Sequence, residues 1–338
     1  MARTAVVLMN LGGPDMLASV RPFLFNLFSD PAIIRLPAVL RGPLAQLLSW
    51  RRTRVAREIY ARLGGSSPLL ANTEAQARAL EAALGPDHRC FVAMRYWHPL
   101  SAETARCVAE WKPEEIVCLP LYPQFSTTTT ASSLAAWRAA ATCAGIGRVA
   151  RVVCCYPSDT GFAAAMAKLI RPVLDSASSL AKAPRLLLTA HGLPKRIVRD
   201  GDPYPCQVEA TAAAIIAAVD RPGIDWRVCY QSRVGPLEWI GPATDDEIQR
   251  AGRETIPLVV APISFVSEHS ETLVELDLDY RRLAETSGVP AYYRVPTVGV
   301  EPEFIRSLAS LVRRACAGER VGSCASANPS CAVAGARD

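Results

Sequence analysis

Short apolar runs rich in β-branched residues alternate along the chain with longer segments in which apolar residues recur at helical spacing. Several short runs are apolar at successive positions, which indicates strands buried on both faces, as in a parallel sheet covered by helices. The predicted strands are Ala5–Asn10, Phe91–Tyr96, Ile116–Leu121, Val149–Cys155, Arg185–Ala190, Leu258–Phe265 and Ala291–Val295. The predicted helices include Asn72–Ala83, Ser101–Trp111, Ser132–Thr142, Gly161–Asp175 and Cys206–Val219. This alternation predicts an α/β fold.

The two halves of the chain open alike, each with a strand that runs into a turn of Gly and Pro. The first strand leads into residues 10–14 (NLGGP), and the strand from Arg185 leads into residues 191–194 (HGLP). At about 150 residues per domain, the length suggests about two domains. We place the N-terminal domain at 1–157 and the second at 158–300, and we expect the segment 301–338 to pack back on the first.

Neither turn has the spacing of a dinucleotide-binding loop. Gly12 and Gly13 are adjacent, and Pro14 stands where the helix would have to open. A Gly-rich loop followed by Lys and Ser or Thr does not occur in the sequence either. We therefore expect no nucleotide cofactor, although ligands in such folds still gather at the carboxyl ends of the strands.

Composition argues against two classes of protein, nucleic-acid binders and secreted disulfide scaffolds. The 338 residues include 37 Lys and Arg against 32 Asp and Glu, and a net charge of +5 is too small for a nucleic-acid binder that acts through its overall field. Eleven cysteines are an odd number and few for the length, which argues against a secreted disulfide scaffold and favours the reducing cytoplasm. The longest uncharged stretch, Ile116–Trp137, is interrupted by prolines and hydroxyl residues, so we expect no transmembrane helix.

The positive charge is concentrated in one segment. Pro31–Arg57 contains no acidic residue. It holds six arginines: Arg35, Arg41, Arg51, Arg52, Arg54 and Arg57. An apolar and basic segment is typical of a membrane-surface contact, and equally of an ordinary amphipathic helix with a solvated basic face.

His191 follows directly after an apolar strand, where a parallel sheet presents its ligand-binding end. An imidazole with an ordinary pKa of about 6.5 can accept a proton near neutral pH, which few other side chains can do. A histidine that bonds the turn backbone would occupy the same position. From position alone both interpretations stay open.

Carboxylates follow the strand that ends near Phe265. Ser267 is a natural N-cap, and Glu268, Glu271 and Glu275 then fall at spacings of three and four, which predicts three carboxylates on one helical face. Such a row is either an exposed acidic face or a place where a divalent cation or protons are handled.

Further candidates stand at other predicted strand ends or in loops. Arg95 and Tyr96 end one strand, and Tyr122 follows another and precedes a run of hydroxyl residues that can bind an anion. Trp239 lies in a Gly/Pro loop, which suits a flat apolar ligand. Together these residues predict a cleft with a base, carboxylates, an arginine for an acidic ligand and aromatic walls.

Several sequence blocks occur in a fixed order: LMNLGGP, PLL after LGGSS, MRYWHPL, LYPQFSTTTTASSL, TAHGLPKRIV with GDPYP, YQSRVGP with WIGP, and ISFVSEHSETLVELDLDY. With these blocks nearly the whole chain resembles the ferrochelatases, lyases that insert ferrous iron into a porphyrin at the end of haem synthesis. The resemblance implies two similar Rossmann-like domains, each a parallel sheet flanked by helices, with the active-site cleft between them.

The resemblance also implies roles for residues of this chain. His191 and Glu271 match the catalytic pair, and these two with Glu268 and Glu275 match positions that meet the Fe2+ substrate or carry protons. The matches to porphyrin-contacting positions are Leu11, Arg95, Tyr96 and Trp239, and Tyr122, at another predicted strand end, is a further candidate for porphyrin binding. Pro31–Arg57 matches a lip over the porphyrin pocket, with a peripheral membrane contact.

Some ferrochelatases carry a [2Fe-2S] cluster, which requires four thiolates. The tail supplies Cys316, Cys324 and Cys331, and Cys155 or its neighbour Cys154 supplies the fourth candidate. The alternative family position near Thr127 has no cysteine, and Ser326 stands near where a ligand is expected. A cluster and a tail with incidental thiols are both compatible with this spacing.

Three functions follow in order of preference. The first is insertion of Fe2+ into protoporphyrin IX. The second is metallation of coproporphyrin or another tetrapyrrole by a chelatase of the same architecture. The third is a non-catalytic porphyrin or iron carrier, which would need no base.

Overall fold

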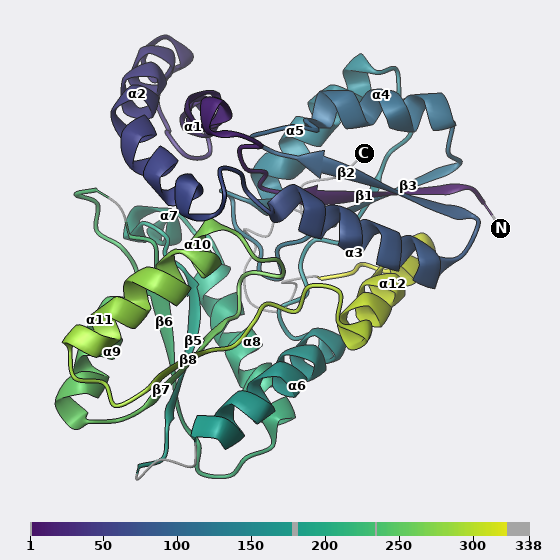
Figure 1. Ribbon diagram of the computed structural model, residues 1–338. Helices are drawn as coiled ribbons and strands as arrows, with labels where there is room; N and C mark the ends of the chain where they lie inside the picture. Colours follow the sequence, from purple (N-terminus) through teal and green to yellow (C-terminus); the bar gives the residue numbers. More distant parts are fainter. Residues whose placement is uncertain (1, 178–181, 234, 323–338) are drawn as a thin grey trace. The chain divides into compact units, whose positions relative to one another are not determined.

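Two parallel four-stranded sheets form the framework of the computed structural model, which describes residues 2–177, 182–233 and 235–322 (Figure 1). The first sheet has the order β2-β1-β3-β4, with β1 (Thr4–Asn10), β2 (His88–Met94), β3 (Glu115–Pro120) and β4 (Arg151–Val152). The second has the order β6-β5-β7-β8, with β5 (Arg185–His191), β6 (Asp225–Gln231), β7 (Leu258–Pro262) and β8 (Tyr292–Arg294). All neighbouring strands run parallel, which confirms the predicted α/β class.

The chain divides into two compact units, each of which packs mainly within itself. Within the described ranges, the first unit holds residues 2–155 and 308–322, and the second holds residues 156–307. The division falls inside one helix, α12 (Pro302–Cys316). Each unit contains one of the two sheets.

Helices cover both faces of each sheet because the central strands are apolar on both faces. In the first unit α4 (Ser101–Trp111) and α5 (Thr130–Cys143) share one apolar core with alternate residues of β1, and α3 (Leu69–Leu84) covers the other face. In the second unit α9 (Thr244–Glu254) and α11 (Tyr280–Thr286) lie on one face, and α6 (Thr160–Ala177) and α8 (Tyr204–Val219) lie on the other (Figure 1).

Both sheets place their first strand second in the order. The connection from β2 to β3 therefore carries the chain from one side of β1 to the other, and the connection from β6 to β7 does the same at β5. The switch points lie between β1 and β3 and between β5 and β7. Ligands of open α/β sheets bind at such switch points, outside the carboxyl ends of the strands. His191 ends β5, and the segment that carries Glu271 follows β7.

Strand β6 was missed from the sequence, and several strands end earlier than predicted. The amino end of β6 is exposed and begins with charged and polar residues, so its apolar alternation is weak. Strand β2 ends at Met94 rather than Tyr96, and β7 ends at Pro262 rather than Phe265. Within the predicted strand 149–155 only Arg151 and Val152 pair as β4.

The last described residues continue the first sheet beyond β4. Val321 forms a parallel bridge with Val153, and its carbonyl accepts the N–H of Cys154 at 3.1 Å. This contact lies beside the strand at the edge of the sheet.

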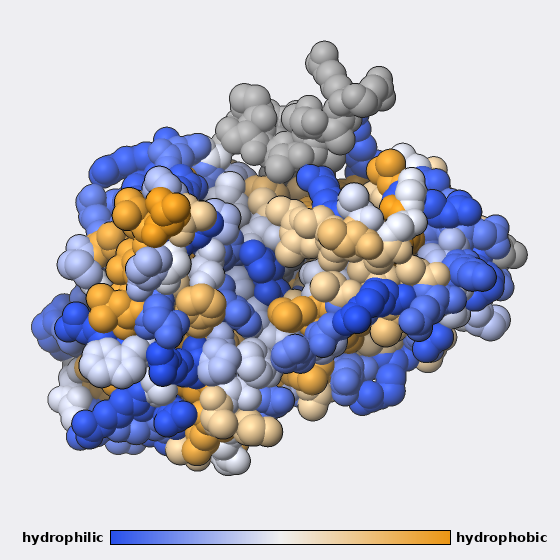
Figure 2. Space-filling view, turned by 90° about the horizontal axis from the view of Figure 1, so that it is seen from above, coloured by the Kyte–Doolittle hydropathy of each residue, from blue (hydrophilic) through white to orange (hydrophobic). Residues whose placement is uncertain are grey.

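The basic segment Pro31–Arg57 supplies the connection and most of the second helix of a helical hairpin in the first unit. The hairpin consists of α1 (Val20–Ser29), a short connection and α2 (Ala38–Arg62). Apolar side chains of α2 remain exposed, including Val39 at 79% and Trp50 at 64%. Figure 2 shows orange apolar side chains next to blue hydrophilic ones on the side where α2 lies in Figure 1. None of the helices in the described ranges combines the length and apolar character that a bilayer crossing demands.

Candidate active site

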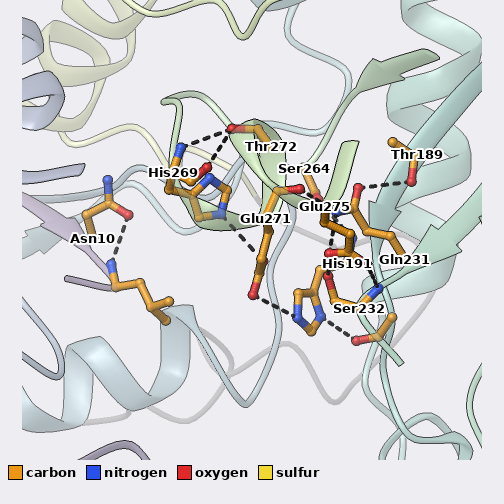
Figure 3. A network of polar contacts seen from close by, with 12 residues as sticks. Asn10, Thr189, His191, Gln231, Ser232, Ser264, His269, Glu271, Thr272 and Glu275 are labelled. Carbon is orange, nitrogen blue, oxygen red and sulfur yellow. Dashed lines mark hydrogen bonds and ion pairs between the residues drawn. The ribbon is translucent and has the colours of Figure 1, made fainter. Parts of the chain in front are cut away.

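The His191 side chain is fixed at the end of β5 by its neighbours. Its backbone N–H donates to Ser264 Oγ at 3.1 Å, and its ring Nδ1 lies 2.6 Å from the carbonyl oxygen of Gly192 (Figure 3). Because a carbonyl only accepts hydrogen bonds, Nδ1 carries a proton. The other ring nitrogen, Nε2, faces Glu271 Oε1 at 3.5 Å, and the side chain is 39% exposed. Nε2 is therefore the nitrogen available for chemistry.

The resting imidazole is protonated. Burial alone would lower the pKa of His191, but the carboxylate of Glu271, the carbonyl of Gly192 and the charge of Glu275 together raise it to about 9. The neutral imidazole expected from the ordinary pKa is thus the minor form near pH 7. His191 must lose a proton before it can accept one.

Glu271 lies between two histidines (Figure 3). One carboxylate oxygen faces His191 Nε2, and the other lies 3.4 Å from His269 Nε2. Burial would raise the pKa of Glu271, but the two imidazoles hold it well below its usual range. The result is a line of three titratable groups in the second unit, His191, Glu271 and His269.

His269 is a site residue that the sequence analysis did not single out. It is buried against the Phe265 ring, with centroids 4.6 Å apart, and its Nδ1 has no hydrogen-bond partner among the described residues. Nε2 faces Glu271, so Nδ1 is the ring nitrogen that remains without a partner within the described residues. Its place two residues before Glu271 is the one sequence signal that could have identified it.

The predicted row of three carboxylates on one helical face does not form. Helix α10 (Ser270–Leu273) begins after His269, which is its N-cap, so Ser267 is not the cap and Glu268 precedes the helix. The His269 N–H and the Thr272 hydroxyl are paired at 3.0 Å and fix this start. A π-helical turn, Glu275–Asp279, then follows in place of regular α-helix.

Glu268 and Glu275 consequently have different partners. Glu268 binds Arg294 Nη1 at 2.5 Å and the Thr297 N–H at 3.0 Å. Burial would raise the pKa of Glu268, but Arg294 and these hydrogen bonds keep it below its ordinary value. Glu275 shows the opposite, because burial and the charge of Glu271 raise its pKa. Of the three glutamates, Glu275 is the one that most readily holds a proton.

Glu275 is held by residues that the sequence analysis did not single out. It accepts hydrogen bonds from the Ser232 N–H at 2.8 Å, the Ser232 hydroxyl at 2.5 Å, Gln231 Nε2 at 3.1 Å and the Tyr280 hydroxyl at 3.0 Å. Gln231 also donates to the carbonyl of Glu271 at 2.9 Å. Gln231 ends the missed strand β6, so no sequence spacing indicated these contacts.

Trp239 lies against the turn that carries His191. Pro194 and Trp239 form an antiparallel bridge, and a Cβ added at Gly192 would come within 3.2 Å of the Trp239 ring. The indole is half-buried, and its Nε1 has no hydrogen-bond partner among the described residues. The ring therefore flanks the turn that carries His191, and its N–H makes no hydrogen bond within the described residues.

The other predicted porphyrin residues lie in the first unit, at the carboxyl ends of its strands. Leu11 follows β1 and packs against the cluster that contains Tyr96. Tyr96 is fully buried and donates its hydroxyl proton to Asp30 at 2.7 Å. Tyr122 is half-buried, with its hydroxyl 3.5 Å from Ser133 Oγ. Because its ring is buried, Tyr96 is placed to hold Asp30 rather than to contact a ligand.

No preformed cation site accompanies these residues. In the described ranges, no group of three or more His, Cys, Asp or Glu side chains is arranged to hold a metal ion. Of the four cluster candidates, Cys324 and Cys331 lie outside the described residues. Cys155 Sγ donates to the Gly322 carbonyl at 3.0 Å, and burial and Glu115 raise the pKa of Cys316. Both thiols thus face oxygen atoms, so the described residues do not by themselves fit a [2Fe-2S] cluster.

Comparison with known proteins shows the family to which the chain belongs. The family model for ferrochelatase matches residues 3–316. A ferrochelatase of Caulobacter vibrioides is 58% identical over 316 residues, which cover 92% of this chain and 90% of the relative, and one of Pelagibacter ubique is 45% identical over the same shares. The solved structure of SirB from Bacillus subtilis with Fe3+ covers 94% of this chain and 96% of its own, with a TM-score of 0.54 and 12% identity, and so supports the fold alone. The chain belongs to the ferrochelatase family.

Proposed function

We propose that this chain inserts Fe2+ into protoporphyrin IX to give protohaem, the terminal step of haem biosynthesis. Two pyrrole N–H protons leave the macrocycle as the metal enters, so each turnover releases two protons. The observation that carries the proposal is the line of His191, Glu271 and His269 at the switch point of the second sheet, in a member of the ferrochelatase family. Such a line provides acceptors at the place where protons must leave.

The first step we propose is loss to solvent of the proton that the partly exposed His191 holds at rest. An approaching Fe2+ brings positive charge toward Glu271 and so weakens the attraction that raises the pKa of His191. The freed Nε2 can then accept a pyrrole proton, while Nδ1 stays bound to the Gly192 carbonyl. The arrival of Fe2+ thereby produces the form of His191 that can accept a proton.

Glu275 is the next acceptor along the proposed path. Its carboxyl lies close enough to Glu271 for charge repulsion to raise its pKa, so it can take up a proton that the low pKa of Glu271 disfavours there. Glu268 forms an ion pair with Arg294. We propose that it delivers iron or protons to the site from the side of Arg294. His191, Glu271, Glu268 and Glu275 are the residues expected to meet Fe2+ as substrate.

For the porphyrin we propose contacts to Leu11, Arg95, Tyr122 and Trp239, with Tyr96 supporting Arg95. Tyr122 and Trp239 are half-buried and offer ring surface to a flat macrocycle. Arg95 offers hydrogen-bond donors to an acidic group.

The main test is turnover of purified protein with protoporphyrin IX and Fe2+, followed by haem absorption, with coproporphyrin as the parallel substrate. We expect protoporphyrin to be metallated with the higher kcat/KM. Binding of porphyrin without metallation would leave a carrier, and preference for coproporphyrin would reassign the substrate.

We further propose a cytoplasmic protein that attaches peripherally to anionic membranes through the α1–α2 hairpin. Leu40, Leu47 and Trp50 are exposed and spaced at about whole turns of α2, which aligns them on one face. Arginines 51, 54 and 57 line a groove beside Trp50. Apolar area and basic charge together favour an anionic lipid surface.

Vesicle sedimentation tests this attachment. We expect binding to anionic vesicles that weakens with salt, weaker binding for Trp50→Ala, and no change for the exposed Arg306→Ala in the second unit. Binding that is insensitive to salt and to lipid charge would contradict the electrostatic part.

A [2Fe-2S] cluster on Cys155, Cys316, Cys324 and Cys331 is a separate proposal, supported by the resemblance and the cysteine count alone. The visible absorption spectrum of anaerobically purified protein tests it, with Cys316→Ser beside Cys143→Ser, an exposed cysteine of α5, as the control.

A further inference from the structure

Asp30, a residue with a buried carboxylate, lies at the start of the connection between α1 and α2. The residue is 4% exposed. Oδ1 accepts the Ala32 N–H at 2.8 Å, and the backbone carbonyl accepts the N–H groups of Ile33 and Ile34 at 3.1 and 2.9 Å. This half of the residue binds only its own turn.

The other carboxylate oxygen, Oδ2, binds a different part of the first unit. It accepts hydrogen bonds from Arg95 Nη2 at 2.8 Å, from the Tyr96 hydroxyl at 2.7 Å and from the hydroxyl of Ser132. Arg95 and Tyr96 follow β2, and Ser132 lies in the first turn of α5. Asp30 thus joins the helical hairpin to the carboxyl end of the sheet.

These contacts fix the guanidinium of Arg95 on several sides. Its Nε donates to Ser132 Oγ at 2.7 Å, Nη2 donates to Asp30, and the group lies 4.9 Å from the centre of the Tyr96 ring. The third nitrogen, Nη1, makes no hydrogen bond within the described residues, and the side chain is still 22% exposed. The arrangement leaves one oriented donor group unused.

A purely structural ion pair would not require one guanidinium nitrogen of Arg95 to remain without a hydrogen bond. Burying a carboxylate is costly unless it is fully hydrogen-bonded, and Asp30 satisfies that condition with Ala32, Tyr96 and Ser132 besides Arg95. Arg95 is instead incompletely satisfied. A planar guanidinium held at two nitrogens presents its third in a fixed direction, which suits a carboxylate acceptor.

We propose that Asp30 is a positioning residue that aims Arg95 Nη1 at a carboxylate of the porphyrin substrate. The inference rests on the proposed function, since it takes the ligand to be a porphyrin that carries carboxylate side chains. Asp30 touches no substrate itself. It sets the direction of the donor and ties that direction to the hairpin.

The experiment compares protoporphyrin IX with its dimethyl ester, which has the same ring and no negative charge. Both are assayed with Fe2+ in the same detergent, and binding is also followed by porphyrin fluorescence without iron. The variants are Asp30→Asn, Asp30→Glu and Ser132→Ala. The matched control is Asp175→Asn, an exposed acid of the second unit paired with Arg221.

For Asp30→Asn we expect the KM and the dissociation constant for protoporphyrin to rise about ten- to a hundredfold, the loss expected for a charge-assisted hydrogen bond, with kcat nearly unchanged. For the ester, wild type and Asp30→Asn are expected to have equal constants. Asp30→Glu keeps the charge and restores part of the affinity for protoporphyrin. Ser132→Ala shifts the constants in the same direction by less, and Asp175→Asn shifts none.

A merely structural role of Asp30 would give a different pattern. Equal losses with both porphyrins, or a fall in kcat without a change in KM, would overturn the inference. If Asp30→Asn fails to fold, Ser132→Ala and Asp30→Glu still decide the question, because selective loss for the charged porphyrin is expected only from a misdirected Arg95.

Failure of the proposed function is recognised separately. If wild type metallates neither porphyrin, the function is wrong, and the fluorescence measurement alone still tests Asp30. If wild type is active but Arg95→Ala binds both porphyrins as tightly as wild type does, the function stands and the role of Asp30 is wrong.

Discussion

The two sheets share one strand order, but the polar groups at their carboxyl ends differ in kind. After β5 and β7, His191, Glu271 and His269 stand in a line with contacts of 3.4 to 3.5 Å, and His191 is 39% exposed. After β2, Arg95, Tyr96 and Asp30 are bound at 2.7 to 2.8 Å, and Asp30 is buried. The first set is loosely paired, and the contact between His191 and Glu271 shifts the pKa values of these two residues, whereas the second set is tightly paired and charge-compensated.

The difference shows that one sheet topology can carry two kinds of group at its strand ends, one suited to exchanging protons and one suited to orienting a ligand. A group that exchanges protons needs a free nitrogen or oxygen and neighbours that shift its pKa, and His191 has both. A group that orients a ligand needs rigidly held partners whose protonation does not change during the reaction. Arg95 has such partners. Fold alone therefore does not assign the roles, and the local hydrogen bonds do.

The largest expected effect is on the exchanging set. We expect His191→Ala to lower kcat for iron insertion by about 10²- to 10⁴-fold, the usual range for loss of a general base, with porphyrin binding largely retained. Steady-state kinetics and porphyrin fluorescence measure the two quantities. The comparison variant is His88→Ala, at the amino end of β2, which should keep full activity. Near-normal metallation by His191→Ala would remove the distinction between the two sets.

A smaller effect is expected from crowding the catalytic turn. Gly192→Ala places a Cβ 2.8 Å from the Gln231 carbonyl and 3.2 Å from the Trp239 ring. Overpacking of this kind costs about 1–3 kcal/mol, so we expect a lower free energy of unfolding and a changed Trp fluorescence spectrum. Gly42→Ala, inside α2 with no atom within 4 Å of the new Cβ, should instead stabilise slightly, because Gly is unfavourable inside a helix. Equal effects of both substitutions would show that the turn is not tightly packed.

The smallest effect is a shift of titration. In Glu271→Gln the pKa of His191 should fall from about 9 toward its ordinary 6.5, measured by NMR of the imidazole protons. The rising limb of kcat/KM with pH, which reports deprotonation of His191 in the free enzyme, should move to lower pH by the same amount. A limb that stays in place would mean that another group governs the rate.

The same pair also contributes to stability in a defined pH window. The part due to His191, whose pKa is raised, is complete below about pH 6.5 and is lost as pH rises through about 9. The part due to Glu271, whose pKa is lowered, is present above about pH 4.5 and is lost as pH falls through its folded value. The melting temperatures of wild type and Glu271→Gln should therefore differ most between about pH 4.5 and 6.5 and converge above pH 9.

The sequence predicts the strand-end positions well because they depend on local patterns. Burial of β1 and β5 on both faces follows from their continuous apolar runs, and His191 was placed correctly at the end of β5. Helix α4 has the predicted bounds, Ser101–Trp111. Periodicity also located the core of the helices α3, α5, α6 and α8.

Interactions between distant positions could not be predicted in this way. Asp30 and Arg95 are 65 residues apart, and Ser232 and Glu275 are 43 apart, so no spacing connects them. The row of three carboxylates was wrong because regular helical period was assumed where the chain has an N-cap at His269 and a π-turn at Glu275–Asp279. The raised pKa of His191 could not be predicted either, because it depends on the charge of Glu271 across the site.

The bridge between Val321 and Val153 has a consequence for shortened forms of the chain. Strand β4 is at the edge of its sheet, and an uncovered edge exposes backbone donors and acceptors that can pair with another molecule. A polypeptide that stops before Val321 would leave this edge bare while both sets of strand-end residues stay intact. Such a fragment should bind porphyrin and yet self-associate, so light scattering, not catalysis, would register its defect.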